Sequence, residues 1–113
     1  MVCSMISLAS LTILCALPDA VVVAPVGAEN PRNSEAAIIQ LKDGSLLLGW
    51  TEFYAGNGAD RGPARISGKS SADGGRTWSE KRTLIENDGG CNVMEVNFLR
   101  LKNGDIAVFY CQK

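Results

Sequence analysis

Two segments that repeat each other 60 residues apart constrain the fold of this chain more than any other feature. Residues 36–50 read AAIIQLKDGSLLLGW and residues 96–110 read VNFLRLKNGDIAVFY, so Leu41 and Leu101 are equivalent. In each segment an Asp-Gly or Asn-Gly pair separates two apolar runs. This pattern predicts a β-hairpin, because Gly and Asn adopt the positive φ angles that tight hairpin turns require.

The strands of these hairpins are apolar on both faces, so we expect both faces to be covered. A sheet packed between similar sheets would cover them, and so would the centre of a parallel α/β sheet. The second arrangement is disfavoured because the stretch between the hairpins shows no helical periodicity and contains one further strand-like run, Ala64–Ser70. The sequence therefore predicts an all-β fold, a partial β-propeller of about one and a half four-stranded antiparallel blades.

The segment Ser71–Trp78, which reads SADGGRTW, is predicted to form the turn between the third and fourth strands. Gly74 and Gly75 permit a tight backbone, and the side chains of Ser71 and Asp73 can bond the amides of the turn. Trp78 can pack between blades. We therefore assign Asp73 a structural role, since short polar side chains in turns usually satisfy their own backbone.

Successive loops of an antiparallel meander alternate between the two ends of the sheet. Arg32, before a first strand expected at Ala36–Leu41, shares an end with the loop at 54–63 and with the loop near residues 88–92. The 42–44 turn and the SADGGRTW segment share the other end. Arg32 and Asp60 are thus predicted to converge on one pocket, while Asp73 faces away from it.

The composition narrows the chemistry that this chain can perform. Eleven Lys and Arg against twelve Asp and Glu leave a net charge of −1 without any block of like charge, which gives no support to a nucleic-acid partner. The chain has no His, so Ser/His/Asp triads and the usual zinc sites cannot be built from it alone. Acid–base work would fall to carboxylates, and we expect neither a metal nor a cofactor.

Residues 1–28 have the layout of a signal peptide, with an apolar stretch at Met5–Leu17 and a small-residue pattern that ends at Ala28. An uncleaved anchor is the alternative, although the apolar run falls short of the roughly 20 residues of a membrane span. Cleavage predicts a secreted or periplasmic protein with no stable membrane insertion and a mature domain at 29–113. Cys3 and Cys15 would leave with the signal. Export permits a disulfide between Cys91 and Cys111, but separate cysteines are favoured because pairing demands a narrow Cα separation.

The SADGGRTW segment is also identified as an Asp-box repeat, and the chain resembles the sialidase (neuraminidase) superfamily of BNR-repeat β-propellers from Pro31 to Trp78. Asp60 lies 11 residues before Ser71, which is similar to the spacing of the family's acid/base aspartate from its box. The resemblance implies a six-bladed propeller of which this chain is the N-terminal fragment. It also implies a retaining exo-sialidase that removes terminal sialic acid from glycans.

The resemblance assigns roles to individual residues. Asp60 would protonate the glycosidic oxygen and later activate water. Arg32 would be one of three arginines that bind the carboxylate of sialic acid. Glu52 matches a glutamate that the family often carries at the end of the second strand. Arg61 and Arg65, on a glycine-rich loop, are interpreted as solvated.

The nucleophilic tyrosine, its glutamate partner and the other two arginines lie in later blades of such enzymes, so we expect this chain alone to be inactive. A sialylated or related glycan is the expected partner. Asp-boxes also occur in noncatalytic propellers, so a propeller that binds glycans or proteins is the alternative function. A degenerate gene remnant that never folds is a third possibility, since the mature part has little core to spare.

Overall fold

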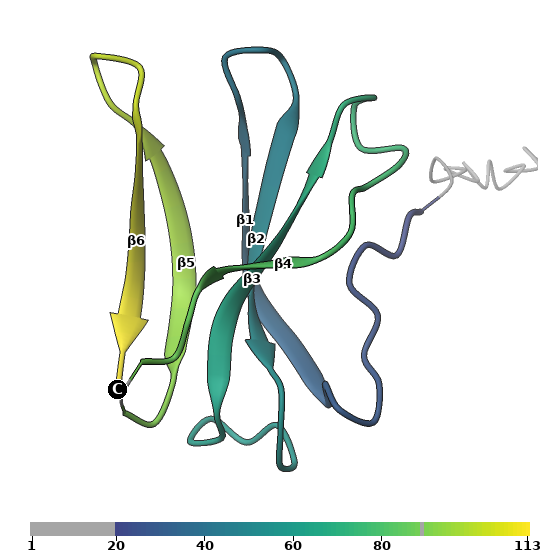
Figure 1. Cartoon of the computed structure of the whole chain (residues 1–113), viewed down its shortest axis with the longest axis vertical. Coiled ribbons are helices and arrows are strands. Elements are labelled where there is room, and N and C mark those ends of the chain that lie inside the picture. The colour runs from purple at the N-terminus through teal and green to yellow at the C-terminus, as the bar shows by residue number, and fades with distance from the viewer. Residues whose placement is uncertain (1–19, 89) are drawn as a thin grey trace, which may run out of the picture.

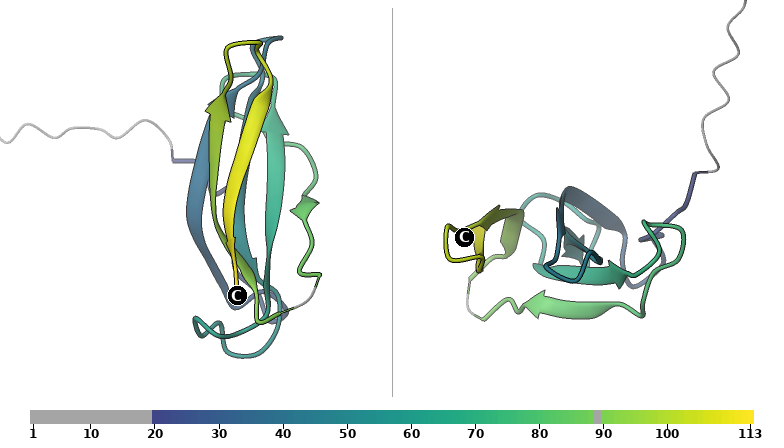
Figure 2. Two further views of the ribbon diagram at one scale, coloured as in Figure 1. Left: turned by 90° about the vertical axis from the view of Figure 1, so that its left-hand side faces the viewer. Right: turned by 90° about the horizontal axis from the view of Figure 1, so that it is seen from above.

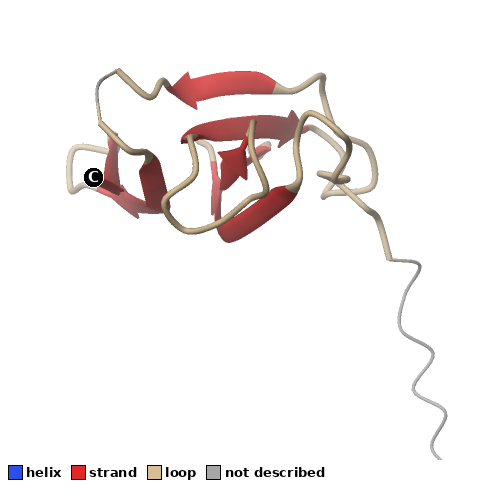
Figure 3. Cartoon of the chain, turned by 90° about the horizontal axis from the view of Figure 1, so that it is seen from below, coloured by secondary structure: helices blue, strands red, loops and turns tan. Residues whose placement is uncertain are grey.

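The computed structural model describes residues 20–88 and 90–113, and every regular element among them is a β-strand (Figures 1 and 3). The predicted all-β fold is therefore confirmed. The Met5–Leu17 stretch, with Cys3 and Cys15, lies outside the described residues. The six antiparallel strands are β1 (Arg32–Gln40), β2 (Leu46–Phe53), β3 (Ala64–Ser71), β4 (Arg82–Ile85), β5 (Val93–Arg100) and β6 (Ile106–Gln112).

The first sheet is a four-stranded meander in the order β1-β2-β3-β4, in which every neighbouring pair is antiparallel. The third strand occupies Ala64–Ser71, close to the predicted run, and β4 follows the SADGGRTW turn as expected. This arrangement is consistent with one blade of a partial propeller. β1 begins at Arg32, so that residue is the first of the strand, whereas the sequence analysis placed it before the strand.

The turns of the two repeated hairpins are built alike, as the sequence predicts. The Leu41 N–H donates to the carbonyl four residues on at 2.7 Å, and the Leu101 N–H makes the equivalent bond at 2.8 Å. Gly44 has a φ of 85° and Gly104 a φ of 87°, which lie in the left-handed region that favours glycine. Both glycines are therefore required by the turn.

The second sheet, β5-β6, stands beside the first, and β5 contacts β1, β2 and β3 (Figure 2). Two buried clusters join the sheets. One consists of Phe53, Ala64 and Met94, and the other of Ile66, Val93 and Val96. Because each cluster draws residues from both sheets, the core of the molecule lies between them.

A pair of glycines in the first sheet makes room for this packing. Gly49 of β2 lies directly opposite Gly68 of β3. A Cβ atom at Gly49 would lie 2.9 Å from Cζ of Phe98, and one at Gly68 would lie 2.6 Å from Cδ1 of Leu84. The absence of side chains at both positions thus lets two apolar side chains pack directly on the sheet.

The expectation that both faces of the hairpins are covered is wrong for the described chain. β5 covers one face of the first sheet, but several apolar side chains elsewhere remain exposed, including Ile38 at 57%, Leu99 at 51% and Phe109 at 55%. These residues lie on β1, β5 and β6. Residues 20–88 and 90–113 form two sheets, and these side chains remain exposed on them.

The two cysteines of the described chain are free, which confirms the interpretation favoured from the sequence. Cys111 lies opposite Met94 in the β5-β6 ladder. Cys91 lies before the start of β5, and its Sγ donates to the carbonyl of Arg61 at 2.8 Å. Sγ of Cys111 donates instead to Oε2 of Glu95 at 3.1 Å, so the two thiols have different partners.

Candidate functional site

The structure brings Arg32 and Asp60 together, as predicted. Arg32 lies opposite Phe53 of β2, and its guanidinium carbon is 4.6 Å from the centroid of the Phe53 ring. Its Nη1 donates to Oδ1 of Asp60 at 2.5 Å and to the carbonyl of Gly58 at 3.1 Å. Packing on the ring fixes the plane of the guanidinium, and the two acceptors fix its rotation.

Asp60 lies in the 54–63 loop that joins β2 to β3, and glycine lets this loop approach Arg32. Gly58 has a φ of 72°, and a Cβ atom there would lie 2.9 Å from Cβ of Arg32. The Gly62 N–H donates to the carbonyl of Ala59 at 2.6 Å and closes the turn around Asp60. The Asp60 side chain itself is 75% exposed, so a ligand in solution can reach it.

The contact with Arg32 changes the acidity of Asp60. The hydrogen bond from the guanidinium, followed by the charge of Arg32, holds the pKa of Asp60 below its ordinary value. The free site therefore contains an ionised carboxylate that neutralises the arginine. An anion that binds Nη1 of Arg32 must compete with Asp60, which accepts from that nitrogen.

Glu35 is a further carboxylate beside Arg32, which the sequence analysis did not identify. β1 contains a bulge between Ser34 and Ala37, and Glu35 within it has a φ of 38°, uncommon for a residue with a side chain. Oε1 of Glu35 lies 3.8 Å from Nη2 of Arg32, and Ser34 Oγ donates to Oε2 at 2.6 Å. Glu95 occupies the equivalent place in a bulge of β5, with a φ of 63°. A glutamate repeated at the 60-residue spacing is the signal that could have revealed this feature.

The segment before β5 reaches the Asp60 loop, so the third predicted loop shares the same end of the molecule. Nδ2 of Asn92 donates to the carbonyls of Asp60 and Gly62, both at 2.9 Å. Sγ of Cys91 donates to the carbonyl of Arg61 at 2.8 Å. Three consecutive carbonyls of the loop are thus bonded to the segment that opens the second repeat.

Glu52 is fully buried at the end of β2 and forms an ionic cluster. Its carboxylate accepts hydrogen bonds from Ser67 Oγ at 2.5 Å and from Arg65 Nε at 2.9 Å. Lys81 Nζ also donates to it. The carboxylate is therefore saturated by three donors, which suits a structural role in holding β2, β3 and the start of β4 together.

The interpretation of Arg65 as solvated is wrong. Its guanidinium is bonded to Glu52 and lies 5.0 Å from the centroid of the Tyr54 ring. The cause is the register of the sheet, which places Arg65 directly opposite Glu52. Arg61, in contrast, is exposed on the loop as predicted.

The SADGGRTW turn has the structural role that was predicted for it. Oδ1 of Asp73 accepts from the amides of Arg76 and Thr77 at 3.0 and 2.9 Å, and Oδ2 accepts from Thr77 Oγ1 at 2.6 Å. These bonds, led by those from Thr77, hold the pKa of Asp73 far below its ordinary value. Trp78 folds back on the turn, since its Nε1 donates to the carbonyl of Gly75 at 2.9 Å.

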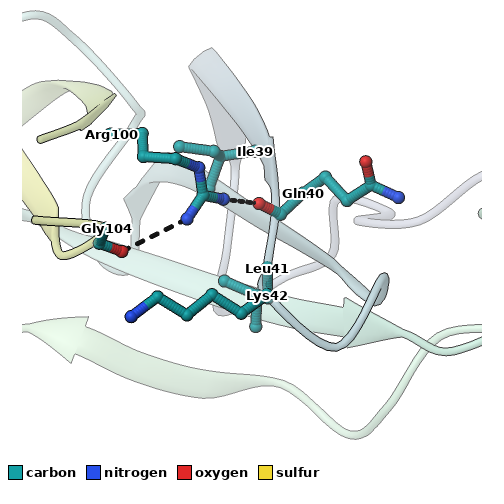
Figure 4. Close-up of a pocket in the computed structure, with 6 residues that line it drawn as sticks. All are labelled: Ile39, Gln40, Leu41, Lys42, Arg100 and Gly104. Atoms are coloured by element: carbon teal, nitrogen blue, oxygen red, sulfur yellow. Dashed lines mark hydrogen bonds between the residues drawn. The ribbon is translucent and has the colours of Figure 1, made fainter. Parts of the chain in front are cut away.

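A cleft lies between the two hairpin turns, at the end of the molecule away from Arg32 (Figure 4). Within it Arg100 donates to the carbonyl of Gly104 at 3.3 Å and to the carbonyl of Gln40. The guanidinium thus fastens the second hairpin to the first. The lining residues are Ile39, Gln40, Leu41, Lys42, Arg100 and Gly104.

A comparison of the chain with protein-family models gives no match, and no curated protein is significantly similar to it. The sialidase resemblance therefore stays a prediction. In the described part of the chain, no helix is long and apolar enough to cross a membrane. Those same residues contain no group of three or more His, Cys, Asp or Glu side chains arranged to hold a metal ion.

The chemistry open to the site follows from Arg32. A planar, permanently charged guanidinium is suited to a carboxylate or a phosphate. Its present partners, Asp60 and Glu35, are carboxylates themselves, and Asp60 is the more exposed of the two at 75% against 36% for Glu35. Asp60 is therefore the partner that a ligand in solution can reach more easily.

Proposed function

We propose that this chain belongs to an exported exo-sialidase-like glycoside hydrolase, a retaining enzyme that removes terminal sialic acid from glycans. Arg32 would bind the carboxylate of the sugar, and Asp60 would serve as the acid/base. The observation that carries the proposal is the 2.5 Å contact between Arg32 and Asp60, at the end of the sheet opposite the Asp-box turn. The proposal gives the chain one part of a site whose nucleophile and other arginines come from further blades.

The pairing of Arg32 with Asp60 also suggests how binding and acid chemistry are linked. A sialic acid carboxylate that takes the guanidinium displaces Asp60 from it. Asp60 then loses the hydrogen bond and the nearby positive charge that lower its pKa. Its pKa rises toward its ordinary value, which is the direction that a general acid needs if it is to donate a proton to the glycosidic oxygen. Substrate binding would thus favour the protonated form of Asp60.

The experiment that tests the binding role is a titration of the chain with N-acetylneuraminic acid, followed by NMR. A single ion pair between Arg32 and the carboxylate of the sugar predicts weak binding, with a dissociation constant of the order of a millimolar. Arg32→Met should weaken binding about tenfold or more, since a charge-assisted pair is lost. Arg61→Met is the matched control, because Arg61 is an exposed arginine beside Asp60 in the 54–63 loop, and it should bind like the native chain.

Asp60→Asn separates binding from chemistry. The variant removes the carboxylate that competes for Arg32, so it should bind N-acetylneuraminic acid at least as tightly as the native chain. In a protein completed by further blades, the same change should abolish hydrolysis of a chromogenic sialoside. Hydrolysis that survives Asp60→Asn would exclude the acid/base role. Robust turnover by the 113-residue chain alone would contradict the proposal that it is a part of the site.

A noncatalytic propeller that binds glycans is the second candidate, and one observation favours it. The hydrogen bond from Nη1 of Arg32 to Oδ1 of Asp60 favours the ionised form of Asp60 in the free site, whereas a general acid must hold a proton. For such a binder, N-acetylneuraminic acid would bind through Arg32, but the completed protein would release no sialic acid.

Both candidate functions include export of the protein. Fractionation of cells that express it would test that part of the proposal.

A further inference from the structure

We propose that Asn92 and Cys91, at the start of the second repeat, are positioning residues that hold the Asp60 loop in place independently of the Arg32–Asp60 ion pair. The role matters for chemistry only if the proposed function is right. The fastening itself is a property of the free chain and can be measured without any substrate.

The 54–63 loop is rich in glycine. It contains Gly56, Gly58 and Gly62, and the first two have positive φ angles of 71° and 72°. Glycine leaves the unfolded and mobile states of a loop with more conformational freedom than other residues do. If the ion pair were the main anchor, a ligand that displaced Asp60 from Arg32 would also release the loop, and the carboxyl would lose its position just when it is needed.

The hydrogen bonds of Asn92 hold the loop without the ion pair. Its side chain is completely buried, and its two Nδ2 hydrogens are used by the carbonyls of Asp60 and Gly62. The amide cannot be reversed, because reversal would point Oδ1 at those two carbonyl oxygens. Among the residues that the structure describes, Oδ1 has no partner, so the side chain tolerates an unsatisfied acceptor in order to make the two donations.

Cys91 adds a third bond from the same segment, to the carbonyl of Arg61. Backbone bonds in turn fix this segment to the end of β6, since the amides of Cys91 and Asn92 both donate to the carbonyl of Lys113. The Lys113 N–H donates back to the carbonyl of Asn92 at 2.9 Å. The second hairpin therefore acts as the support on which the Asp60 loop is held.

Hydrogen exchange of the Gly62 amide tests the proposal, because this N–H donates within the loop and reports its opening. Loss of the two bonds in Asn92→Ala should speed its exchange roughly tenfold or more. Asp60→Asn, which removes the charge of the ion pair and leaves the bonds of Asn92 in place, should have a much smaller effect. Asn97→Ala is the control, since Asn97 is an exposed residue of β5, and it should leave the exchange unchanged.

A second pair of variants keeps the test decisive if Asn92→Ala does not fold. Cys91→Ala removes one bond and should speed Gly62 exchange, while Cys91→Ser keeps a donor and should restore it. The pKa of Asp60, followed by carboxyl NMR, should rise in the loosened variants that fold, because Asp60 then spends less time on Arg32. A mere loss of global stability would not move that pKa in the folded molecule.

Two results would overturn the proposal. One is native exchange at Gly62 in folded Asn92→Ala, or in Cys91→Ala where Asn92→Ala does not fold. The other is a loop that opens as fully in Asp60→Asn as in Asn92→Ala, which would make the ion pair its main anchor. Neither result depends on sialic acid, so a failure of the proposed function would be recognised separately by the binding titration.

Discussion

Replacement of Glu52 by Gln tests whether the buried ionic cluster stabilises the first sheet. The side chain of Glu52 is 1% exposed and accepts from three donors on β3 and before β4. Breaking a buried pair typically costs about 3–5 kcal/mol, because a charge is left without its partner. Arg65 and Lys81 are 29% and 41% exposed, so water can solvate both cations after the change. We therefore expect the lower end, a loss of about 3 kcal/mol.

Urea unfolding followed by tryptophan fluorescence measures this loss, because Trp50 is 2% exposed and lies two residues from Glu52 on the same strand. Glu86→Gln is the matched control, since Glu86 is exposed, and it should change the free energy of unfolding by less than about 0.5 kcal/mol. Lys81→Met should cost about 1 kcal/mol, because Glu52 keeps its other two donors and Lys81 is partly solvated.

The loss of stability in Glu52→Gln should also depend on pH, in a direction that follows from the pKa of Glu52. Burial alone would raise the pKa of Glu52, but the hydrogen bonds from Lys81, Ser67 and Arg65 outweigh it and leave the pKa below its ordinary value of 4.5. The ionised form is thus favoured by folding. The difference in stability between native and Glu52→Gln should be full above pH 4.5 and shrink as the pH falls through the lowered pKa. A difference below 0.5 kcal/mol at neutral pH, or one that grows in acid, would refute the reasoning.

Two further changes test the packing and the Asp-box turn. Gly68→Ala should destabilise the chain by about 1–3 kcal/mol, because the new methyl group would lie 2.8 Å from the carbonyl oxygen of Leu48, whereas Gly27→Ala, with nothing within 4 Å, should be nearly neutral in the same urea experiment. Asp73→Asn should speed hydrogen exchange of the Thr77 amide and leave binding of N-acetylneuraminic acid unchanged; weaker binding in that variant would contradict the separation of the turn from the Arg32 end.

The fold could be predicted from the sequence because its strongest signals are local. The Asp-Gly and Asn-Gly turns fix two hairpins, and a meander of short strands leaves few alternatives for the residues between them. The convergence of Arg32 on Asp60 follows from the same topology, since alternating loops share an end whatever the side chains do. These predictions needed no knowledge of packing.

The rest of the site depends on register, which the sequence does not display directly. A bulge shifts every following side chain of a strand, and the bulge at Glu35 is what brings its carboxylate to Arg32. The solvated interpretation of Arg65 is wrong because the run that begins at Ala64 does not show which residue of β2 lies opposite, and the register places Glu52 there. Nothing in the sequence predicts the role of Asn92, because its partners are backbone carbonyls, which every residue has.

The pKa of Asp60, measured by carboxyl NMR with and without N-acetylneuraminic acid, tests the central claim most directly. The account predicts a pKa below the ordinary value of 3.8 in the free chain and a higher pKa when the sugar carboxylate occupies Arg32. The rise should be absent in Arg32→Met, where Asp60 has no guanidinium to lose. An Asp60 pKa that stays the same when N-acetylneuraminic acid saturates the native chain would contradict the account, because the sugar would then bind without displacing Asp60 from Arg32.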